Sequence, residues 1–272
     1  SQQRSVRNAE AAQRREEARS ERLEAQFERA WAHFRLEDVS GAVGLLLTHL
    51  TPWFENTYMP EAHLLQTYSL FLLCKFPSAN SEIEAFRSKY IAVNAQLEAS
   101  LMRSDPASAF EQTRGLIDGQ RTDIPAQILE PYLSESRFLK AVKAVTKAEE
   151  EVARLRNVSS NPFSTKVMEW VVNRRAELIQ SEGARIKSYL EAQGNALATM
   201  LQDTEIARLD ILRLETQLYE QAAVLGEMEE ARRLAQRQLR VPRGQQRWAY
   251  EGEYWADELG YYRVMAKPVC PS

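Results

Sequence analysis

The sequence predicts an all-α protein: a short solenoid of helical hairpins, then a long-helix antiparallel coiled coil, and last a small aromatic clasp. Three observations predict this fold class. The 272 residues include only ten glycines and ten prolines, so few positions interrupt a helix. Alanine, leucine, glutamate, glutamine and arginine dominate, which is typical of long helices and coiled coils. Apolar residues recur at helical and heptad spacings along the chain.

The charge and hydropathy of the chain exclude some classes of function. A net charge of −3 argues against a dedicated nucleic-acid binder, which usually carries a basic excess. No apolar run approaches the roughly 20 residues that span a bilayer, so no membrane span is expected. The chain begins at Ser1 rather than Met, which indicates either a removed signal peptide or an expression boundary.

The first element expected is a charged helix over residues 1–23, as part of a helix that reaches residue 36. It mixes charges of both signs at helical spacings, which is typical of a solvated face. Whether this segment is docked or frayed is left open. A repeat domain is expected next, over residues 24–126. Its run from Phe34 to Ala42 aligns with the run from Phe71 to Ala79, 37 positions later. A helical hairpin repeated at this period indicates a solenoid.

The two hairpins resemble tetratricopeptide repeats over residues 24–103. The resemblance is carried by small residues at the expected helix crossings, followed four positions later by a large apolar residue: Ala30, Ala42 and Leu46, then Thr67, Ala79 and Ile83. His33 and Leu70 depart from the aromatic that the motif usually has in its first helix. The alternative is two ordinary hairpins that happen to align. The resemblance implies a concave surface that binds peptides or proteins and is rarely catalytic. The partner-binding residues that we expect there are Trp31, Phe34, His63, Gln66 and Tyr68.

A connecting region follows over residues 104–126, where Asp105 before Pro106 is typical of a capped helix start. The coiled-coil domain is expected over 127–241. Its first helix, to residue 156, carries a heptad. Asn161-Pro162 ends it, with Ser160 or Asn161 as the next cap, and a second helix then runs to Pro242.

The second helix of the coiled coil is too long for the first one to cover. Three arrangements are open: the long helix folds back near Gly194, the N-terminal helix packs on it, or two chains pair as a homodimer. We favour a hairpin-like coiled coil whose remaining length covers the repeats or a second chain.

Residues that carry chemistry are few. The sequence has no phosphate loop, no nucleophile elbow and no zinc-protease motif, so we expect no enzyme, no cofactor and no metal. His33, His49 and His63 have no common metal spacing and are interpreted as helix-surface or groove residues. Cys74 and Cys270 form either one disulfide or two idle thiols.

A basic segment near the end of the long helix is a candidate site for an anionic partner. Its members, with no acid among them, are Arg232, Arg233, Arg237, Arg240, Arg243 and Arg247. The alternative is that these cations only favour a helix C-terminus and cover apolar surface.

Residues 242–272 are expected to form the aromatic clasp, as a β-hairpin that packs on the helices. Its tyrosines and tryptophans alternate with acids at a strand-like period. The acids Glu251, Glu253, Asp257 and Glu258 leave a metal-binding or enzymatic alternative open.

A broader resemblance joins "PEAHLLQTYSLFLLCKF" to "GEYWADELGYY" downstream. Together these segments resemble tetratricopeptide proteins of the deltaproteobacterial periplasm or outer envelope, some of which serve gliding-motility machines. The resemblance implies a non-enzymatic scaffold or adaptor of an envelope complex, with a cytoplasmic location as the alternative. The competing function is a structural coiled coil that forms homo-oligomers, with its groove filled by its own chain.

Overall fold

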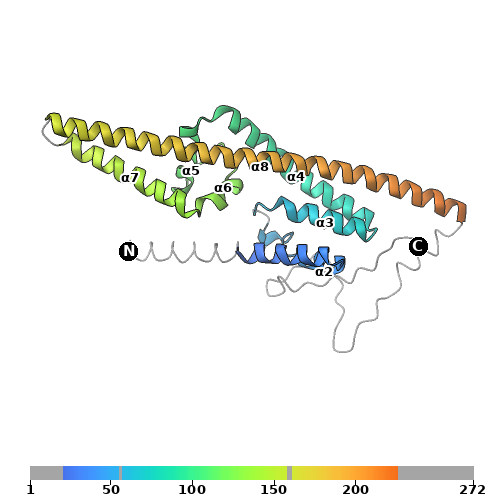
Figure 1. Cartoon of the computed structure of the whole chain (residues 1–272). Coiled ribbons are helices and arrows are strands. Elements are labelled where there is room, and N and C mark those ends of the chain that lie inside the picture. The colour runs from blue at the N-terminus through green and yellow to red at the C-terminus, as the bar shows by residue number, and fades with distance from the viewer. Residues whose placement is uncertain (1–20, 55–56, 158–160, 226–272) are drawn as a thin grey trace, which may run out of the picture. The chain divides into compact units, whose positions relative to one another are not determined.

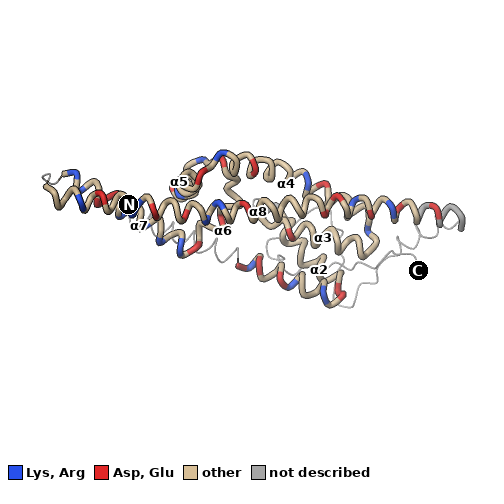
Figure 2. Tube along the Cα trace, turned by 45° about the horizontal axis from the view of Figure 1, so that its top comes forward, with Lys and Arg blue, Asp and Glu red and all other residues tan. Residues whose placement is uncertain are grey.

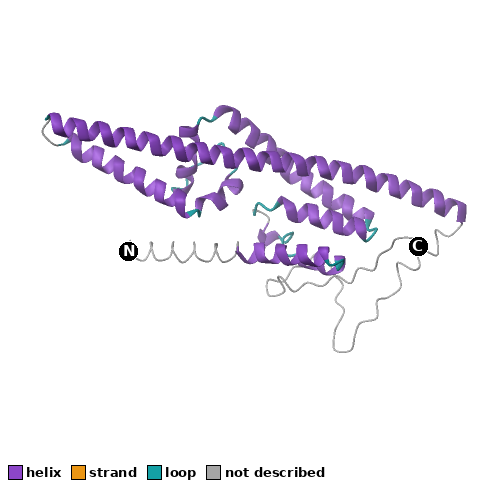
Figure 3. Cartoon of the chain, in the orientation of Figure 1, coloured by secondary structure: helices purple, strands orange, loops and turns teal. Residues whose placement is uncertain are grey.

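The computed structural model describes residues 21–54, 57–157 and 161–225, and within them every regular element is a helix (Figure 1, Figure 3). The all-α fold class is therefore confirmed for this part of the chain. The predicted helix over 1–23 lies mostly outside these ranges, and the predicted clasp lies wholly outside them. A helix over residues 21–35 comes first. The later elements are α2 (Val39–Leu46), the 3-10 helix η1 (Pro52–Phe54), α3 (Pro60–Leu72), α4 (Phe76–Arg103), α5 (Pro106–Ile117), α6 (Ala126–Leu133), α7 (Ser136–Arg156) and α8 (Pro162–Leu225).

Contacts divide the chain into two compact units. Unit 1 comprises residues 1–87 and 202–272, and unit 2 comprises residues 88–201. The boundaries fall inside α4 and α8, so each of these helices contributes to both units. These units divide the chain at other places than the predicted repeat and coiled-coil domains, whose boundaries stay predictions.

Unit 1 is built on two helical hairpins whose turns are the same. Glu37 and Cys74 both adopt a left-handed backbone, with φ of 64° and 53°. The amide of Asp38 donates a hydrogen bond to the carbonyl of His33 at 3.0 Å. In the second turn the amide of Lys75 donates to the carbonyl of Leu70 at 2.9 Å. The amide of Glu37 also donates a hydrogen bond to the carbonyl of Phe34, and the amide of Cys74 donates to the carbonyl of Phe71 in the same way. Each turn is thus a Schellman helix end, and the two recur 37 residues apart.

The core of unit 1 lies between these hairpins and the last part of α8. The small residues Ala30, Ala42, Thr67 and Ala79 are each fully buried, as are Leu46 and Ile83. One apolar cluster joins the helix over 21–35 to α2 and α3. A second cluster joins α3 and α4 to Ala207 and Ile211 of α8. Part of the long helix therefore covers the second hairpin, which agrees with the favoured arrangement in which its remaining length covers the repeats.

Unit 2 begins its α5 with the predicted cap: the Asp105 carboxylate accepts a hydrogen bond from the amide of Ser108 at 2.7 Å. The prediction of a continuous helix over 127–156 is wrong. The chain forms α6 up to Leu133 and starts α7 at Ser136, with Pro131 inside α6. A proline lacks the amide that would bond the carbonyl four residues earlier, so Pro131 weakens the helix that was expected to continue here. Asn161, one of two predicted caps, accepts hydrogen bonds from the amides of Phe163 and Ser164 at 3.0 and 2.8 Å.

The long helix α8 is unbroken at Gly194, so the fold-back considered there is wrong. A Cβ at Gly194 would lie 3.3 Å from a methyl group of Leu97 on α4, which indicates that the glycine serves helix packing. Gly183 is in closer contact still. Its position faces the backbone carbonyl of Pro106, and a Cβ there would overlap that oxygen. The start of α5 therefore lies directly against α8.

Ion pairs join three helices of unit 2. The carboxylate of Glu149 on α7 receives hydrogen bonds from Arg114 on α5 and from Arg175 on α8, at distances from 2.6 to 3.1 Å. The hydrogen bond from Arg114, followed by that from Arg175, lowers the pKa of Glu149. Lys and Arg alternate with Asp and Glu along the helices (Figure 2). This mixing fits the near-balanced charge of the chain.

Candidate functional site

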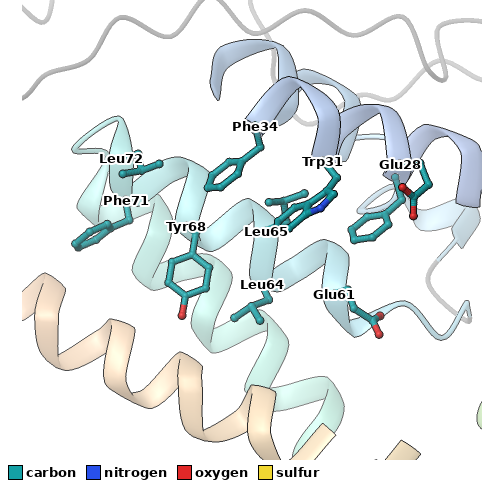
Figure 4. A pocket seen from close by; sticks show the side chains of 10 residues that line it. Glu28, Trp31, Phe34, Glu61, Leu64, Leu65, Tyr68, Phe71 and Leu72 are labelled. Carbon is teal, nitrogen blue, oxygen red and sulfur yellow. The ribbon is translucent and has the colours of Figure 1, made fainter. Parts of the chain in front are cut away.

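A groove lies between the helix over 21–35 and α3, with a volume of about 600 Å³ (Figure 4). Both walls belong to unit 1. The groove is lined by Phe27, Glu28, Trp31, Phe34, Glu61, Leu64, Leu65, Tyr68, Phe71 and Leu72. Eight of these ten residues are aromatic or aliphatic, so the groove suits the apolar side chains of a ligand.

The spacing of residues along each helix forms the two walls. Phe27, Trp31 and Phe34 follow the i, i+4, i+7 pattern that places side chains on one face of a helix. On α3, Leu64, Tyr68 and Phe71 share a face in the same way. Leu65 is also part of the buried cluster beneath, so the floor of the groove is continuous with the core. The groove is therefore anchored to a packed part of unit 1.

Trp31 and Tyr68 remain accessible from solvent, with 38% and 37% of their surface exposed. The ring of Trp31 stacks on Phe34 at 5.7 Å between centroids, and the guanidinium of Arg35 lies 5.4 Å from the Trp31 centroid. Burial raises the pKa of the Tyr68 hydroxyl, and the carboxylates of Asp203 and Asp210 raise it further. Tyr68 is therefore protonated at neutral pH and can donate a hydrogen bond to a ligand.

The two acids of the groove lie at the same end. Glu28 on one wall and Glu61 on the other lie at this end, whereas Phe71 and Leu72 lie at the opposite end (Figure 4). The groove thus has a polarity along α3, acidic near the start of that helix and apolar near its end. A ligand that carries a cation beside apolar side chains complements this arrangement.

Of the five predicted partner-binding residues, Trp31, Phe34 and Tyr68 line the groove and two do not. His63 pairs with Glu82 of α4, at 2.5 Å from Nδ1 to Oε1. Gln66 is buried, with 4% of its surface exposed. Both lie on a different face of α3. Sequence reasoning missed the other seven lining residues, although for Phe27, Leu64 and Phe71 the helical spacing carried the signal.

The end of the groove near Leu72 adjoins Cys74, the left-handed residue of the second turn. Cys74 is disulfide-bonded, and no described cysteine is free. Cys270 lies outside the described residues. The choice between a disulfide and an idle thiol is thus decided at Cys74.

The remaining predicted sites lie outside the described residues. These are the six arginines from Arg232 to Arg247 and the acids of the clasp from Glu251 to Glu258. Within the described ranges, no group of three or more His, Cys, Asp or Glu residues is placed to hold a metal ion. Nor is any helix there long and apolar enough to cross a membrane.

No protein-family model, curated protein or solved structure matches the chain. The function is therefore inferred from the groove.

Proposed function

We propose that the chain is a non-enzymatic scaffold or adaptor that holds a segment of a protein partner in the groove. The observation that carries this proposal is an apolar groove with accessible aromatic side chains on both walls. Tryptophan and tyrosine are enriched among the residues that dominate binding energy at protein interfaces. The chemistry of the lining suits binding rather than bond-making.

The tetratricopeptide resemblance supports the proposal from the side of the fold. The Schellman turns at Glu37 and Cys74 have the same hydrogen bonds 37 residues apart, as a repeated unit requires. The small residues expected at the helix crossings are all buried. We therefore interpret unit 1 as two tetratricopeptide-like hairpins capped by α8, and α7 with the adjoining part of α8 as a coiled-coil hairpin.

A place in the cell envelope is the location we propose. Disulfides persist in oxidising compartments such as the periplasm and are rare in the cytosol. The disulfide at Cys74 supports the periplasmic or outer-envelope location. A role in an envelope complex, such as motility machinery, rests on the sequence resemblance alone.

Selection from a displayed library of random peptides tests the proposed function. The full chain, in oxidised and reduced form, serves as the target. We expect enriched peptides that combine aromatic or aliphatic residues with Lys or Arg. Their affinity should fall by about tenfold or more in Trp31→Ala, as for a typical interface anchor. Tyr68→Ala should weaken them as well.

Two further variants sharpen this selection. Glu61→Lys should shift the preference away from basic peptides, because its cation offsets the remaining charge of Glu28 at the acidic end of the groove. Ile91→Ala, an exposed position outside the groove lining, is the matched control and should leave the affinity unchanged. If neither the oxidised nor the reduced chain enriches peptides that depend on Trp31, the scaffold proposal is rejected.

Homo-oligomerisation is the second candidate function. Phe163 and Trp170, one heptad apart near the start of α8, are 77% and 68% exposed. Large aromatic residues exposed at this spacing are typical of a surface that pairs with another helix. A second copy of the chain is the partner proposed for this surface.

A further inference from the structure

The groove has a covalent anchor at one end. Cys74 lies two residues beyond Leu72, the last lining residue of α3, and is disulfide-bonded. Its backbone is fixed by the Schellman turn, in which its amide bonds the carbonyl of Phe71 at 2.9 Å. The chain contains two cysteines, so Cys270 is the one partner that this chain can offer to Cys74.

The segment that precedes Cys270 has the right reach for the groove. From Glu61 to Cys74, α3 and its turn extend over 13 residues, or roughly 20 Å at the helical rise per residue. An extended chain advances about 3.3 Å per residue, so in an extended segment Arg263, seven residues before Cys270, would lie roughly 23 Å from it. A segment tethered at Cys74 and laid antiparallel to α3 therefore brings Arg263 to Glu61.

The same segment complements the groove in chemistry. Tyr262, Val264 and Met265 lie on either side of Arg263 in the sequence "YYRVMAKPVC". When Arg263 is at the acidic end, Val264 and Met265 come next to the aromatic walls, and Tyr262 lies beyond that end. The guanidinium would then face two carboxylates, those of Glu28 and Glu61 (Figure 4). The length, the place of Arg263 and the apolar residues that follow it match the groove, whereas Lys267 is a second cation closer to the tether.

We propose that residues 261–269 of this chain occupy the groove as an internal ligand, tethered by a disulfide between Cys74 and Cys270. The inference rests on the proposed function, because it takes the groove as the binding surface for a partner. It adds that this surface is regulated by the chain itself. The tethered segment competes with a protein partner. Reduction of the tether frees the groove.

The redox step is a two-electron exchange. When the tether forms, the thiols of Cys74 and Cys270 lose two protons and two electrons to a disulfide oxidant, which becomes a dithiol. When a dithiol reductant opens the tether, it returns two protons and two electrons to the two sulfurs and becomes a disulfide itself. The tether keeps the segment at a millimolar effective concentration, whereas without the disulfide it is joined to the groove only through a longer stretch of backbone, which lowers its effective concentration.

Photocrosslinking of the full chain tests the proposal. Tyr68 is replaced by p-benzoylphenylalanine, a photoreactive aromatic residue of similar shape, and crosslinked peptides are identified by mass spectrometry. In the oxidised chain we expect crosslinks from position 68 to residues 261–269 within the same molecule. Treatment with dithiothreitol should reduce their yield by about tenfold or more, because the tether is lost. Cys270→Ser should do the same without any reductant.

Controls separate the tether from the fold. The same photoreactive residue at position 170, which does not line the groove, should give no crosslink to 261–269. Cys270→Ser is preferred to a change at Cys74, since Cys74 has a left-handed backbone and packs on the core of unit 1. Arg263→Glu should lower the crosslink yield, and Glu61→Lys combined with it should restore the yield.

Three results would overturn the inference: a peptide map in which Cys74 is not joined to Cys270, crosslinks between two chains in place of crosslinks within one, or crosslinks that persist unchanged in Cys270→Ser. The peptide selection described above distinguishes this failure from failure of the scaffold role. If the inference holds, Cys270→Ser selects Trp31-dependent peptides more strongly than the oxidised chain. Equal selection by the two chains rejects the internal ligand and keeps the scaffold.

Discussion

Two residues in left-handed backbone conformations show what the hairpin turns require. Glu37 and Cys74 hold positions that glycine usually occupies at a helix end. A residue with a Cβ in this conformation costs roughly 1 kcal/mol relative to glycine. At Cys74 the side chain forms a disulfide, which explains why a cysteine and not a glycine holds this position. Glu37 is exposed, so a substitution there tests the turn alone.

Glu37→Gly should raise the free energy of unfolding by about 1 kcal/mol, because it relieves the left-handed strain without removing a buried contact. Urea denaturation followed by circular dichroism measures the change. Glu37→Ala is the control and should give no gain, because alanine keeps the Cβ. A loss of stability in Glu37→Gly would show that the turn is not strained.

His49 is buried, so its interpretation as a surface or groove residue is wrong. Its neutral ring donates from Nε2 to the carbonyl of Leu23 at 2.9 Å, and the ring meets Phe27 edge-on at 6.2 Å. His49 therefore supports the helix that forms one wall of the groove. Burial lowers the pKa of its imidazole, because a charged ring would lose contact with water, and the nearby charge of His63 lowers it further.

The stability of unit 1 should consequently depend on pH through His49. The unfolded chain binds the proton at a pKa of about 6.5, whereas the folded chain binds it only at lower pH. The stabilisation is fully present above about pH 6.5 and is lost as the pH falls below that value. We expect the urea midpoint to drop over this interval in the native chain and to stay flatter in His49→Gln. Equal slopes for the two chains would contradict this assignment.

At the scale of residues, sequence reasoning located the groove but not its full lining. Trp31, Phe34 and Tyr68 could be predicted because exposed aromatic residues in a helical hairpin array indicate a binding surface. His63 and Gln66 could not be separated from them, since their positions on α3 depend on where α4 packs. The pairing of His63 with Glu82 is a contact between residues distant in the sequence.

At the scale of elements, most helix ends follow local rules. The cap at Asp105 and the cap at Asn161 were predictable because both depend on a few adjacent residues. The continuity of α8 through Gly194 was not, because one glycine permits a break without requiring it. Packing decides the outcome: Leu97 fills the space beside Gly194. The packing of α8 on the second hairpin likewise depends on contacts between residues distant in the sequence.

Two glycines of α8 should respond differently to alanine. At Gly183 a Cβ would overlap the carbonyl of Pro106, so Gly183→Ala should cost about 3 kcal/mol or more, since backbone must move. At Gly194 the nearest atom is a flexible leucine methyl at 3.3 Å. The gain in helix propensity, about 1 kcal/mol, should offset the crowding there and leave little net change. Thermal unfolding of both variants measures the difference, and equal losses would show that α5 is not held against α8.

At the scale of the whole molecule, the state of association separates the two candidate functions. We expect the mass measured by light scattering to rise above 31.2 kDa with concentration if Phe163 and Trp170 join two copies. Replacing both with serine should then abolish the rise. Tyr68→Ala, which lies on the groove, is the control and should leave the association unchanged. A mass that stays at the monomer value over the concentration series rejects the second candidate.

The contact at Gly183 also limits how α8 can slide. A helix with heptad seams can shift along its neighbours by seven residues and still find apolar partners, because its pattern repeats. Gly183 lacks a side chain where the Pro106 carbonyl approaches. The adjacent Glu182 carboxylate accepts a hydrogen bond from the hydroxyl of Tyr132 at 2.9 Å. A slip by one heptad would bring Leu190 or Ala176 against that carbonyl, and either Cβ would collide with it. Gly183 therefore restricts α8 to a single register against α5, because only a residue without a Cβ fits beside the Pro106 carbonyl.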